Sequence, residues 1–435
     1  MDADSKSPLI YVISDLHIGG DEKIGKVDFR EEFLSFLQRL ESKDEEIELI
    51  INGDAFGLWE YTGLEGLEAL DELIASYPEL FEQLRKTGET VQITLLPGNH
   101  DHELAAYDDY VDRLAEYNIS LKQTEATTRQ MDGQVIHFEH GHQHDPNNRF
   151  EDFGNPYERP LGYYYNTHIV SRAGHLAERG GFDWLSDVQA VTPTERMPSW
   201  LLSKYVYREM HPLLRYSLIP FLLLFNISVL LALFLALDLL NIWSAPVEAA
   251  AAFLRQFGMA GTAAYTVLGA NIVIAGLLAL AAIPLSLIIR DIRNTVERFD
   301  VIEGDITVNP ETPYRQAAAE IFEDNPEISV YCYGHTHRPL IERLDDGVIA
   351  NSGTWLKRLH RREVIAGVLP PVYYPSYQLG AIRIEQVSDG VQVSYEAIEK
   401  PSPISEDLIW IERLLAVGRE PDPMIPESVV IETDG

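Results

Sequence analysis

Short apolar runs alternate with longer amphipathic ones over the first 140 residues of the chain. Apolar runs of this length are typical of buried strands, whereas an apolar residue at every third or fourth position indicates a helix with one buried face. The expected strands are residues 9–14, 47–52, 91–96 and 134–139, and the expected helices are residues 29–42, 64–77 and 103–116. Strands separated by helix-length segments predict a layered α/β fold, in which helices flank a β-sheet core.

A second group of apolar runs lies toward the C-terminus and is expected to complete the sheet region. Strands are expected at residues 328–333, 338–343 and 347–351. Residues 379–398 carry Asp389-Gly390 at their centre, and this dipeptide between two alternating runs is typical of a β-hairpin. The last residues, 419–435, are acidic, and we expect a mobile tail there.

Two long apolar segments interrupt this pattern. Residues 217–240 contain one charge, Asp238, and residues 264–289 contain none. Because an α-helix rises about 1.5 Å per residue, each segment is long enough to cross the roughly 30 Å hydrocarbon core of a bilayer. Basic residues flank the pair on both outer sides, which places both flanks in the cytoplasm. We therefore expect a two-helix transmembrane hairpin in the cell membrane, with the catalytic domain and both termini cytoplasmic. The alternative is a pair of buried helices in a soluble protein.

These patterns divide the chain into six parts. They are a first core part (1–142), a substrate cap and linker (143–216), the transmembrane hairpin (217–289), a helical linker (290–327), a second core part (328–400), and a C-terminal helix with an acidic tail (401–435).

The composition is strongly acidic, with 68 Asp and Glu against 34 Lys and Arg and a formal charge of −34. Since 46% of the residues are hydrophobic, the chain is not a disordered acidic polymer. Concentrated salt screens such a charge, so the balance favours a halophilic protein, with an ordinary acidic protein as the alternative. The chain contains no run of basic residues, and this counts against a nucleic acid partner. The single cysteine, Cys332, excludes an intrachain disulfide and lies in an apolar run, where a buried thiol is expected.

Side chains that can bind metal ions follow five of the expected strands. They stand in Asp15-Leu16-His17, Gly53-Asp54, Gly98-Asn99-His100-Asp101, His140-Gly141-His142 and Gly334-His335-Thr336-His337. Ligands of α/β sheets gather at the carboxyl ends of strands. Mixed carboxylate, amide and imidazole ligands suit Mn²⁺, Fe or Zn²⁺. Two such ions polarise a phosphoryl oxygen and lower the pKa of a water between them, so we expect a two-metal hydrolytic site.

This ordered set resembles the calcineurin-like metallophosphoesterase family, whose motifs are DxH, GD, GNH(D/E), a single H and GHxH. The resemblance covers residues 9–142 and about 328–355. It implies a metal-dependent hydrolase of phosphoric esters or diphosphates with two divalent ions, of which Mn²⁺ is expected first. It also implies that Asp15, His17 and His337 bind one ion, that Asn99, His140 and His335 bind the other, and that Asp54 bridges them. By the same resemblance, His100 contacts the phosphate or protonates the leaving group, and Asp101 orients its ring.

Two positions in this assignment stay open. Gly141-His142-Gln143-His144 also fits GHxH, which leaves His140 and His142 as alternative ligands. Residues 334–337 are preferred for that motif because they follow their own apolar strand. Residues 351–354, Asn-Ser-Gly-Thr, either line the phosphate site or form a turn.

A narrower resemblance concerns the substrate. GDAFGLWE at 53–60 and GHTHRP at 334–339 resemble the branch that contains the UDP-2,3-diacylglucosamine pyrophosphatases, which act at the membrane surface on a lipid-linked diphosphate. The chain departs from that branch at His100, where an arginine is usual, and in its additional apolar segments. The branch is therefore a guide to the substrate class and not to the substrate itself.

Residues 143–176 are dense in aromatic, Asn and Arg side chains and are expected to form a substrate cap. Arg149, Arg159 and Arg172 are its candidate phosphate-binding residues. The function expected from the sequence is a membrane-anchored phosphoesterase that hydrolyses a phosphodiester or diphosphate bond of a nucleotide-linked lipid. The alternatives are an anchored phosphodiesterase or nuclease with a soluble substrate and a metal-binding scaffold without turnover. A transporter is disfavoured because Asp238 is the only ionisable group in the expected spans.

Overall fold

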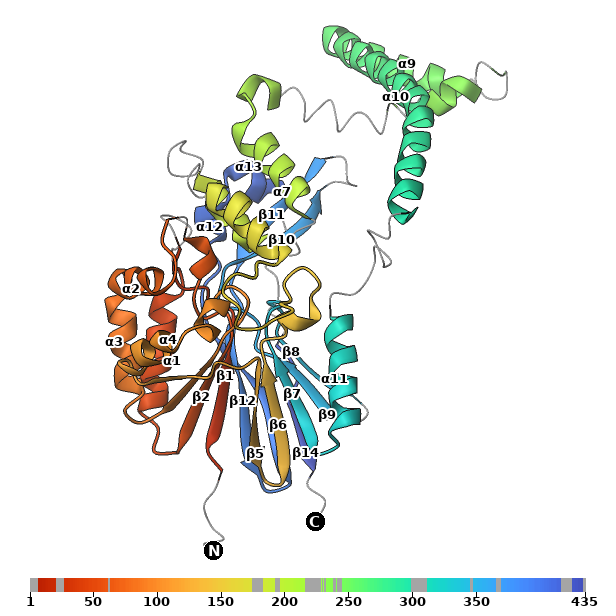
Figure 1. Ribbon diagram of the computed structural model, residues 1–435. Helices are drawn as coiled ribbons and strands as arrows, with labels where there is room; N and C mark the ends of the chain where they lie inside the picture. The colour runs from red at the N-terminus through yellow and green to blue at the C-terminus, as the bar shows by residue number, and fades with distance from the viewer. Residues whose placement is uncertain are drawn as a thin grey trace, which may run out of the picture.

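The computed structural model describes residues 7–20, 27–61, 63–173, 183–191, 196–215, 245–298, 311–344, 347–364, 369–415 and 425–432, with a few more between 228 and 240. Two β-sheets pack face to face, and helices cover both outer faces (Figure 1). The expected layered α/β core is thus confirmed.

The first sheet has seven strands in the order β14-β13-β12-β1-β2-β3-β4. Their bounds are β1 (Leu9–Ile13), β2 (Ile47–Asn52), β3 (Gln92–Leu96), β4 (Ile119–Leu121), β12 (Leu379–Val387), β13 (Gly390–Ile398) and β14 (Val429–Glu432). Strands β1 to β4 are parallel, so their carboxyl ends meet at one edge of the sheet. Strands β12, β13 and β14 continue the sheet in antiparallel pairs.

The second sheet has five strands in the order β5-β6-β7-β9-β8. Their bounds are β5 (Ala126–Met131), β6 (Gln134–Glu139), β7 (Ile328–Tyr333), β8 (Leu340–Leu344) and β9 (Gly347–Asn351). The central strands β6, β7 and β9 are parallel. Their carboxyl ends therefore deliver His140 and His335 to the same side of the sheet.

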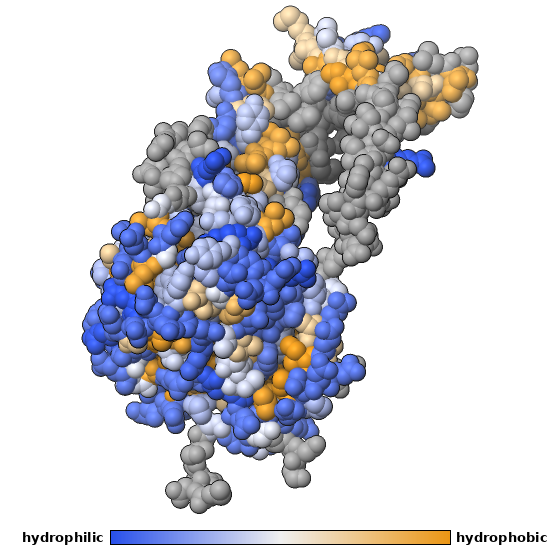
Figure 2. All heavy atoms as spheres, viewed as in Figure 1, coloured by the Kyte–Doolittle hydropathy of each residue, from blue (hydrophilic) through white to orange (hydrophobic). Residues whose placement is uncertain are grey.

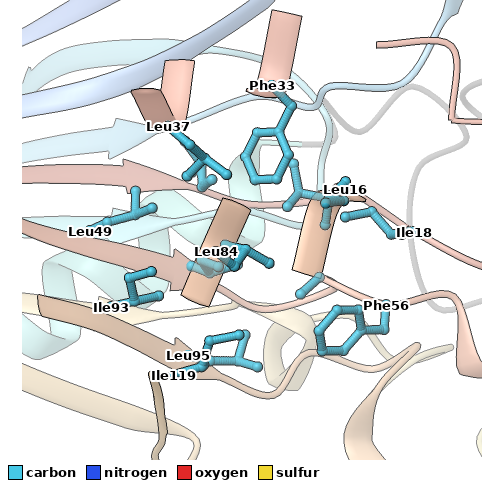
Figure 3. Close-up of a cluster of buried hydrophobic side chains, with 14 of the residues drawn as sticks. Leu16, Ile18, Phe33, Leu37, Leu49, Phe56, Leu84, Ile93, Leu95 and Ile119 are labelled. Atoms are coloured by element: carbon cyan, nitrogen blue, oxygen red, sulfur yellow. The ribbon is translucent and has the colours of Figure 1, made fainter. Parts of the chain in front are cut away.

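The apolar runs are continuous because the central strands are buried on both faces. In β1, Leu9, Tyr11 and Ile13 face the helices, whereas Ile10 and Val12 face the second sheet. Figure 3 shows part of the helix-side core, where Phe33 and Leu37 lie over the strands. Complete burial of each such side chain contributes about 1.5–3 kcal/mol.

Helices cover the two outer faces of the sandwich unequally. The seven-stranded sheet is covered by α1 (Arg30–Glu41), α2 (Leu67–Ser76), α3 (Pro78–Thr87) and α4 (Asp108–Ala115), and the five-stranded sheet by α11 (Thr312–Asp324). The 3-10 helices of the loops are η1 (Leu58–Glu60), η2 (His102–Ala105) and η3 (His142–His144).

A separate cap lies over the end of the sandwich at which the parallel strands end (Figure 1). We define the cap as residues 143–215, 358–376 and 404–415. Its elements are α5 (Leu161–Tyr165), η4 (Asn166–Val170), η5 (Asp183–Ala190), α7 (Met197–Lys204), η7 (Tyr205–Glu209), β10 (Arg358–Val364), β11 (Leu369–Ser376), α12 (Ile404–Asp407) and α13 (Trp410–Leu415). Strands β10 and β11 form their own two-stranded sheet, although the sequence assigns these residues to the core.

The cap has its own core and its own buried ion pairs. Trp200 of α7 is fully buried against Leu359 and Tyr373 of the two-stranded sheet. Glu412 of α13 is buried and lies 2.7 Å from the guanidinium of Arg208 and 3.5 Å from the ammonium of Lys204. The three stretches of chain therefore pack as one unit.

Several expectations about smaller elements are corrected by the structure. The acidic tail is not wholly mobile, because Val429–Glu432 forms β14 and pairs with β13. Side chains alternate between the two faces of β14, so Val429 and Ile431 both pack on the core between the sheets. This packing stabilises an otherwise polar segment. Helix α3 and strands β4 and β5 were not expected from the apolar pattern, whereas the hairpin of β12 and β13 around Asp389-Gly390 is confirmed. Cys332 is buried as expected.

The expected transmembrane hairpin is not found. Most of residues 217–240 lie outside the described residues, and the second segment lies within α10 (Gly258–Arg298), which follows α9 (Ala245–Arg255). Within the part of the chain that the structure describes, no helix is both long and apolar enough to cross a membrane. Apolar side chains on α9 and α10 are exposed, as Figure 2 shows near the top of the molecule.

Candidate metal centre

The candidate ligands lie in loops with unusual backbone geometry. Asp15, His17, Asp54, His335 and His337 all have φ between 44° and 64°. Among the described residues, only two other non-glycine residues have positive φ. Side chains other than glycine seldom adopt this conformation, and such strain concentrates at functional sites. The loops are therefore shaped to bring these side chains together.

One ligand group joins the first loop to the last motif. The candidate atoms of Asp15, His17 and His337 all lie within 4.8 Å of one another. The Nε2 atom of His337 is 3.1 Å from Oδ1 of Asp15 and 3.3 Å from Nε2 of His17. This is the set that the family resemblance implies for the first ion.

A second group lies around Asp54 and has the same spread. It contains Asp54, His140 and His335. Oδ2 of Asp54 is 3.1 Å from Nε2 of His140 and 3.7 Å from Nε2 of His17. One carboxylate oxygen thus faces a histidine of each group, which is the arrangement a bridging ligand requires.

Buried polar atoms at the centre fit two divalent cations. Oδ1 of Asp15, Oδ1 of Asn99 and Nε2 of His140 are buried and make no hydrogen bond within the described residues. The other ring nitrogen of His140, Nδ1, donates to the carbonyl of Asn52 over 2.9 Å. That bond orients the ring so that Nε2 is the atom available to a metal ion, which would take the place of its proton. Oxygen and imidazole donors of this kind suit divalent transition metals.

Two motif glycines allow the loops to approach this closely. A Cβ atom at Gly53 would overlap the ring of His140, and one at Gly98 would overlap the carboxylate of Asp54. Gly53 also has a φ of 86°. Glycine is therefore required at both positions by contact with the ligands themselves.

Electrostatics favour opposite charges within the cluster. Burial would raise the pKa of Asp15, but the adjacent His337 lowers it to about 2. Burial would lower the pKa of His140, but the carboxylate of Asp54 raises it to about 10. The carboxylates are therefore ionised, as ligands of a cation must be.

His100 has a partner that the sequence did not reveal. Its Nδ1 donates to Oε1 of Glu60 over 2.9 Å, and its ring lies 4.5 Å from that of His17. Burial opposes protonation of His100, but Glu60 and then Asp54 raise its pKa to about 9. His100 is thus an imidazolium near neutral pH. Glu60 ends the sequence GDAFGLWE at residues 53–60, and its place there was the one sequence feature that pointed to a role for this residue.

Asp101 does not orient the ring of His100 as expected. Its Oδ1 accepts the N–H of Gly98 over 2.6 Å, and its Oδ2 accepts the N–H of Phe56 over 3.1 Å. Burial and then the charge of Asp54 raise the pKa of Asp101 to about 7. Asp101 therefore joins the two loops that carry Asp54 and Asn99.

Further side chains support the ligands from outside the expected motifs. Asp145 accepts a hydrogen bond from Nε2 of His335 over 3.1 Å, and Asn148 accepts one from the amide of Asn99 over 3.3 Å. Thr354 donates to the carbonyl of Asp15 over 2.8 Å. Residues 351–354 thus hold the first ligand loop. The sequence singled out residues 351–354, but it gave no role to Asp145 or Asn148, because such supporting groups follow no spacing rule along the chain.

The alternative histidines lie outside the two ligand groups. His142 is buried, and neither ring nitrogen makes a hydrogen bond within the described residues. His144 instead meets Oε1 of Glu139 over 2.6 Å. The structure therefore brings His140 to the centre together with the motif at 334–337.

Of the three cap arginines, Arg159 lines a cavity together with Trp59 and Tyr163. Its guanidinium lies 3.5 Å from Glu103 and 4.8 Å from the ring centre of Tyr163. Arg149 and Arg172 are exposed. The structure does not bring these three side chains together into the expected clamp.

Comparison with known proteins identifies the family to which the chain belongs. The profile of the calcineurin-like phosphoesterases matches residues 8–225, which are 218 of the 435 residues. The chain belongs to the calcineurin-like phosphoesterase family and is a metal-dependent phosphoester hydrolase. The match ends before His335 and His337, which the fold brings to the same centre.

Two solved structures illustrate the range of similar proteins. A conserved protein of Streptococcus pneumoniae TIGR4, described as a predicted phosphoesterase, is 10% identical over 92% of this chain and 94% of its own, with a TM-score of 0.29. The phosphopantetheinyl hydrolase of Mycobacterium tuberculosis is 11% identical over 81% of this chain and 91% of its own, with a TM-score of 0.27. No curated protein matches the chain.

Proposed function

We propose that this hydrolase cleaves a phosphodiester or diphosphate bond at a centre for two divalent metal ions. One observation carries the proposal: Oδ2 of Asp54 faces Nε2 of His17 and Nε2 of His140 from two ligand groups. In this assignment Asp15, His17 and His337 hold one ion, and Asn99, His140 and His335 hold the other. When bound, two such ions polarise the phosphoryl group and activate a water molecule. Mn²⁺ remains the first metal to test.

The chain itself supplies the proton for the leaving group. His100 is protonated near neutral pH because Glu60 and Asp54 raise its pKa to about 9, against the effect of burial. Glu60 holds Nδ1 of the ring, which leaves Nε2–H as the donor to the substrate. A donor in this position can bind a phosphoryl oxygen or protonate the oxygen that leaves.

A cavity beside His100 is suited to the leaving group. It has a volume of about 390 Å³ and is lined by Trp59, Tyr163, Arg159 and Glu103 among others. The ring of Trp59 lies 4.6 Å from that of His100. Because Trp59 also lines the cavity, its ring lies between the cavity and the proton donor. Trp59 and Tyr163 give the cavity aromatic walls suited to a ring-bearing group, and Glu65, Glu68 and Glu103 favour an uncharged group over a phosphate. We therefore place a sugar or nucleobase of the substrate there.

The experiment that tests the proposed function measures Mn²⁺-dependent hydrolysis in concentrated KCl. The substrates are bis(p-nitrophenyl) phosphate and the monoester p-nitrophenyl phosphate. We expect the diester to be cleaved, and the D54N variant to lose at least about a hundred-fold in rate, because even indirect support of a metal site contributes 10- to 100-fold.

The matched control is D132N. Asp132 also has positive φ, 50°, but it lies in the turn between β5 and β6. Its variant should keep wild-type activity. Full activity in D54N, or hydrolysis of the monoester alone, would contradict the proposal.

A further inference from the structure

Two arginines beside the metal centre lack the carboxylate partners that other arginines of this chain have. Arg129 lies 2.7 Å from Glu48, and Arg315 is paired with Glu342. Among the described residues, neither Arg338 nor Arg358 forms an ion pair with a carboxylate. Arg215 and Arg343 also lack a carboxylate partner among the described residues, but their guanidinium groups donate to backbone carbonyls.

Both arginines extend from loops that contact the ligand Asp15. Arg338 directly follows His337, whose Nε2 is 3.1 Å from Oδ1 of Asp15. Arg358 begins β10 and comes four residues after Thr354, whose hydroxyl donates to the carbonyl of Asp15 over 2.8 Å. The first arginine therefore belongs to the core and the second to the cap. Together they lie where these two parts meet.

Local contacts fix Arg358 and its neighbour on the same strand. The Nη1 atom of Arg358 donates to Oε1 of Gln378 over 3.1 Å, a neutral partner that leaves the guanidinium charge uncompensated. His360 lies two residues further on β10, hence on the same face, and its Nε2 is 2.6 Å from Oγ of Ser376. Burial and then the charge of Arg358 lower the pKa of His360 to about 4, so Arg358 is the charged side chain of this pair.

The positive charges of this region act on one another. Burial, and then the charges of Arg338 and Arg196, lower the pKa of Arg358 to about 10, although Tyr395 and Glu311 act in the opposite direction. Glu311 already accepts a hydrogen bond from Tyr333 over 2.7 Å. Like charges held together under a cap cost free energy unless an anion joins them.

We propose that Arg338 and Arg358 bind a second phosphate of the substrate, next to the phosphate held at the metal centre. The inference rests on the proposed function and narrows it from phosphodiesters in general to diphosphates. A guanidinium matches two phosphate oxygens at once, so a pair of arginines recognises a doubly charged group well.

The corresponding reaction is the hydrolysis of a P–O–P linkage. The oxygen of water forms a bond to the phosphorus at the metal centre, and the bond from that phosphorus to the bridging oxygen breaks. The bridging oxygen leaves with the second phosphate and takes a proton from His100, while the proton lost by water returns the histidine to its original state. Two phosphate monoesters result. The arginines hold the leaving phosphate.

Competition between two anions tests this inference on the Mn²⁺-loaded protein. Imidodiphosphate carries two linked phosphoryl groups and resists hydrolysis, whereas inorganic phosphate carries one. Both are used as inhibitors of bis(p-nitrophenyl) phosphate cleavage, with Mn²⁺ in excess. R338A and R358A should each weaken inhibition by imidodiphosphate about ten-fold, the effect of losing one charge-assisted contact. Inhibition by inorganic phosphate should not change.

The control is R361A. Arg361 lies on the same strand but is exposed and paired with Glu363. Its variant should bind both anions as the wild type does. R358K keeps the charge and should retain part of the preference for imidodiphosphate, which separates recognition from a folding defect. Equal weakening of both anions, or no weakening of imidodiphosphate, would overturn the inference.

A thermal-shift measurement with the same two anions does not need turnover. If the wild type cleaves neither the diester nor a diphosphate, but imidodiphosphate still raises its melting temperature more than phosphate does and R338A and R358A abolish that difference, the proposed function fails and the second-phosphate site stands. If the diester is cleaved and the difference is absent, the function stands and the site fails.

Discussion

Nδ1 of His100 donates to Oε1 of Glu60 over 2.9 Å, although the two residues follow different strands of the seven-stranded sheet. The Glu60 carboxylate is buried, with 1% of its side chain exposed, so little solvent screens the pair. This hydrogen bond fixes the orientation of the His100 ring and favours its protonated form. The competence of His100 as a proton donor therefore depends on a residue forty positions away in the chain.

Replacement of Glu60 should alter the sensitivity of the reaction to the leaving group. In E60Q the carboxylate that stabilises the imidazolium is lost, so protonation of the departing oxygen becomes the limiting event. We expect kcat to fall about a hundred-fold for a diester with an alkyl leaving group and much less for p-nitrophenolate, which leaves without a proton. H100N should show the same pattern. Equal losses for both leaving groups would show that His100 only binds phosphate.

Asp101 should affect stability rather than leaving-group dependence. D101N replaces an acceptor by a donor, which leaves the buried N–H of Gly98 or Phe56 without its partner. The free energy of unfolding should fall by about 1–3 kcal/mol, measured by urea denaturation of the metal-free protein. A changed ratio between alkyl and p-nitrophenyl substrates, without a loss of stability, would restore the role that the sequence predicted.

The C-terminal strand should contribute to stability on one face only. Ile431 packs on the core between the sheets, whereas Val430 points the other way along β14. I431D should lower the free energy of unfolding by about 1–3 kcal/mol, since it places a charge against apolar side chains. V430D should change it by less than about 0.5 kcal/mol. Equal effects of the two changes in denaturation curves would indicate that the segment does not pair as a strand.

The cavity beside Trp59 should select the leaving group by size. Y163A removes one aromatic wall and the ring on which Arg159 lies. We expect KM to rise about ten-fold for a diester with a nucleoside leaving group, because a stacked base contributes 1–3 kcal/mol. KM for methyl p-nitrophenyl phosphate should not change. A similar rise for both substrates would place the nucleoside elsewhere.

The layered α/β core and the ligand loops could be predicted from the sequence for one physical reason, although the division of the core into two sheets could not. Strands buried on both faces are uninterrupted apolar runs, and the polar residues that end them stand out clearly. Asp15, Asp54 and His140 could be placed in this way, and the structure brings them together. Partnerships such as that of Glu60 with His100 could not be predicted, because hydrogen bonds between loops leave no periodic trace.

The cap was only partly predictable for a related reason. Residues 143–176 are conspicuous for their aromatic side chains, but β10 and β11 look like further strands of the core. Only the tertiary packing of Trp200 on Leu359 and Tyr373 assigns them to the cap. Likewise, the apolar segments at 217–240 and 264–289 suggested membrane spans through their length and lack of charge, but no helix of the described residues is both long and apolar enough to cross a membrane.

The order in which the residues are synthesised determines when the cap can pack. Lys204 and Arg208 are synthesised about two hundred residues before Glu412, the buried carboxylate that neutralises them. Strands β10 and β11 are also delivered late. A nascent chain can complete its first parallel strands early, but the cap over the ligand loops cannot pack until Glu412 has been synthesised. The ligand loops after β1, β2 and β3 are therefore made well before the cap that covers them.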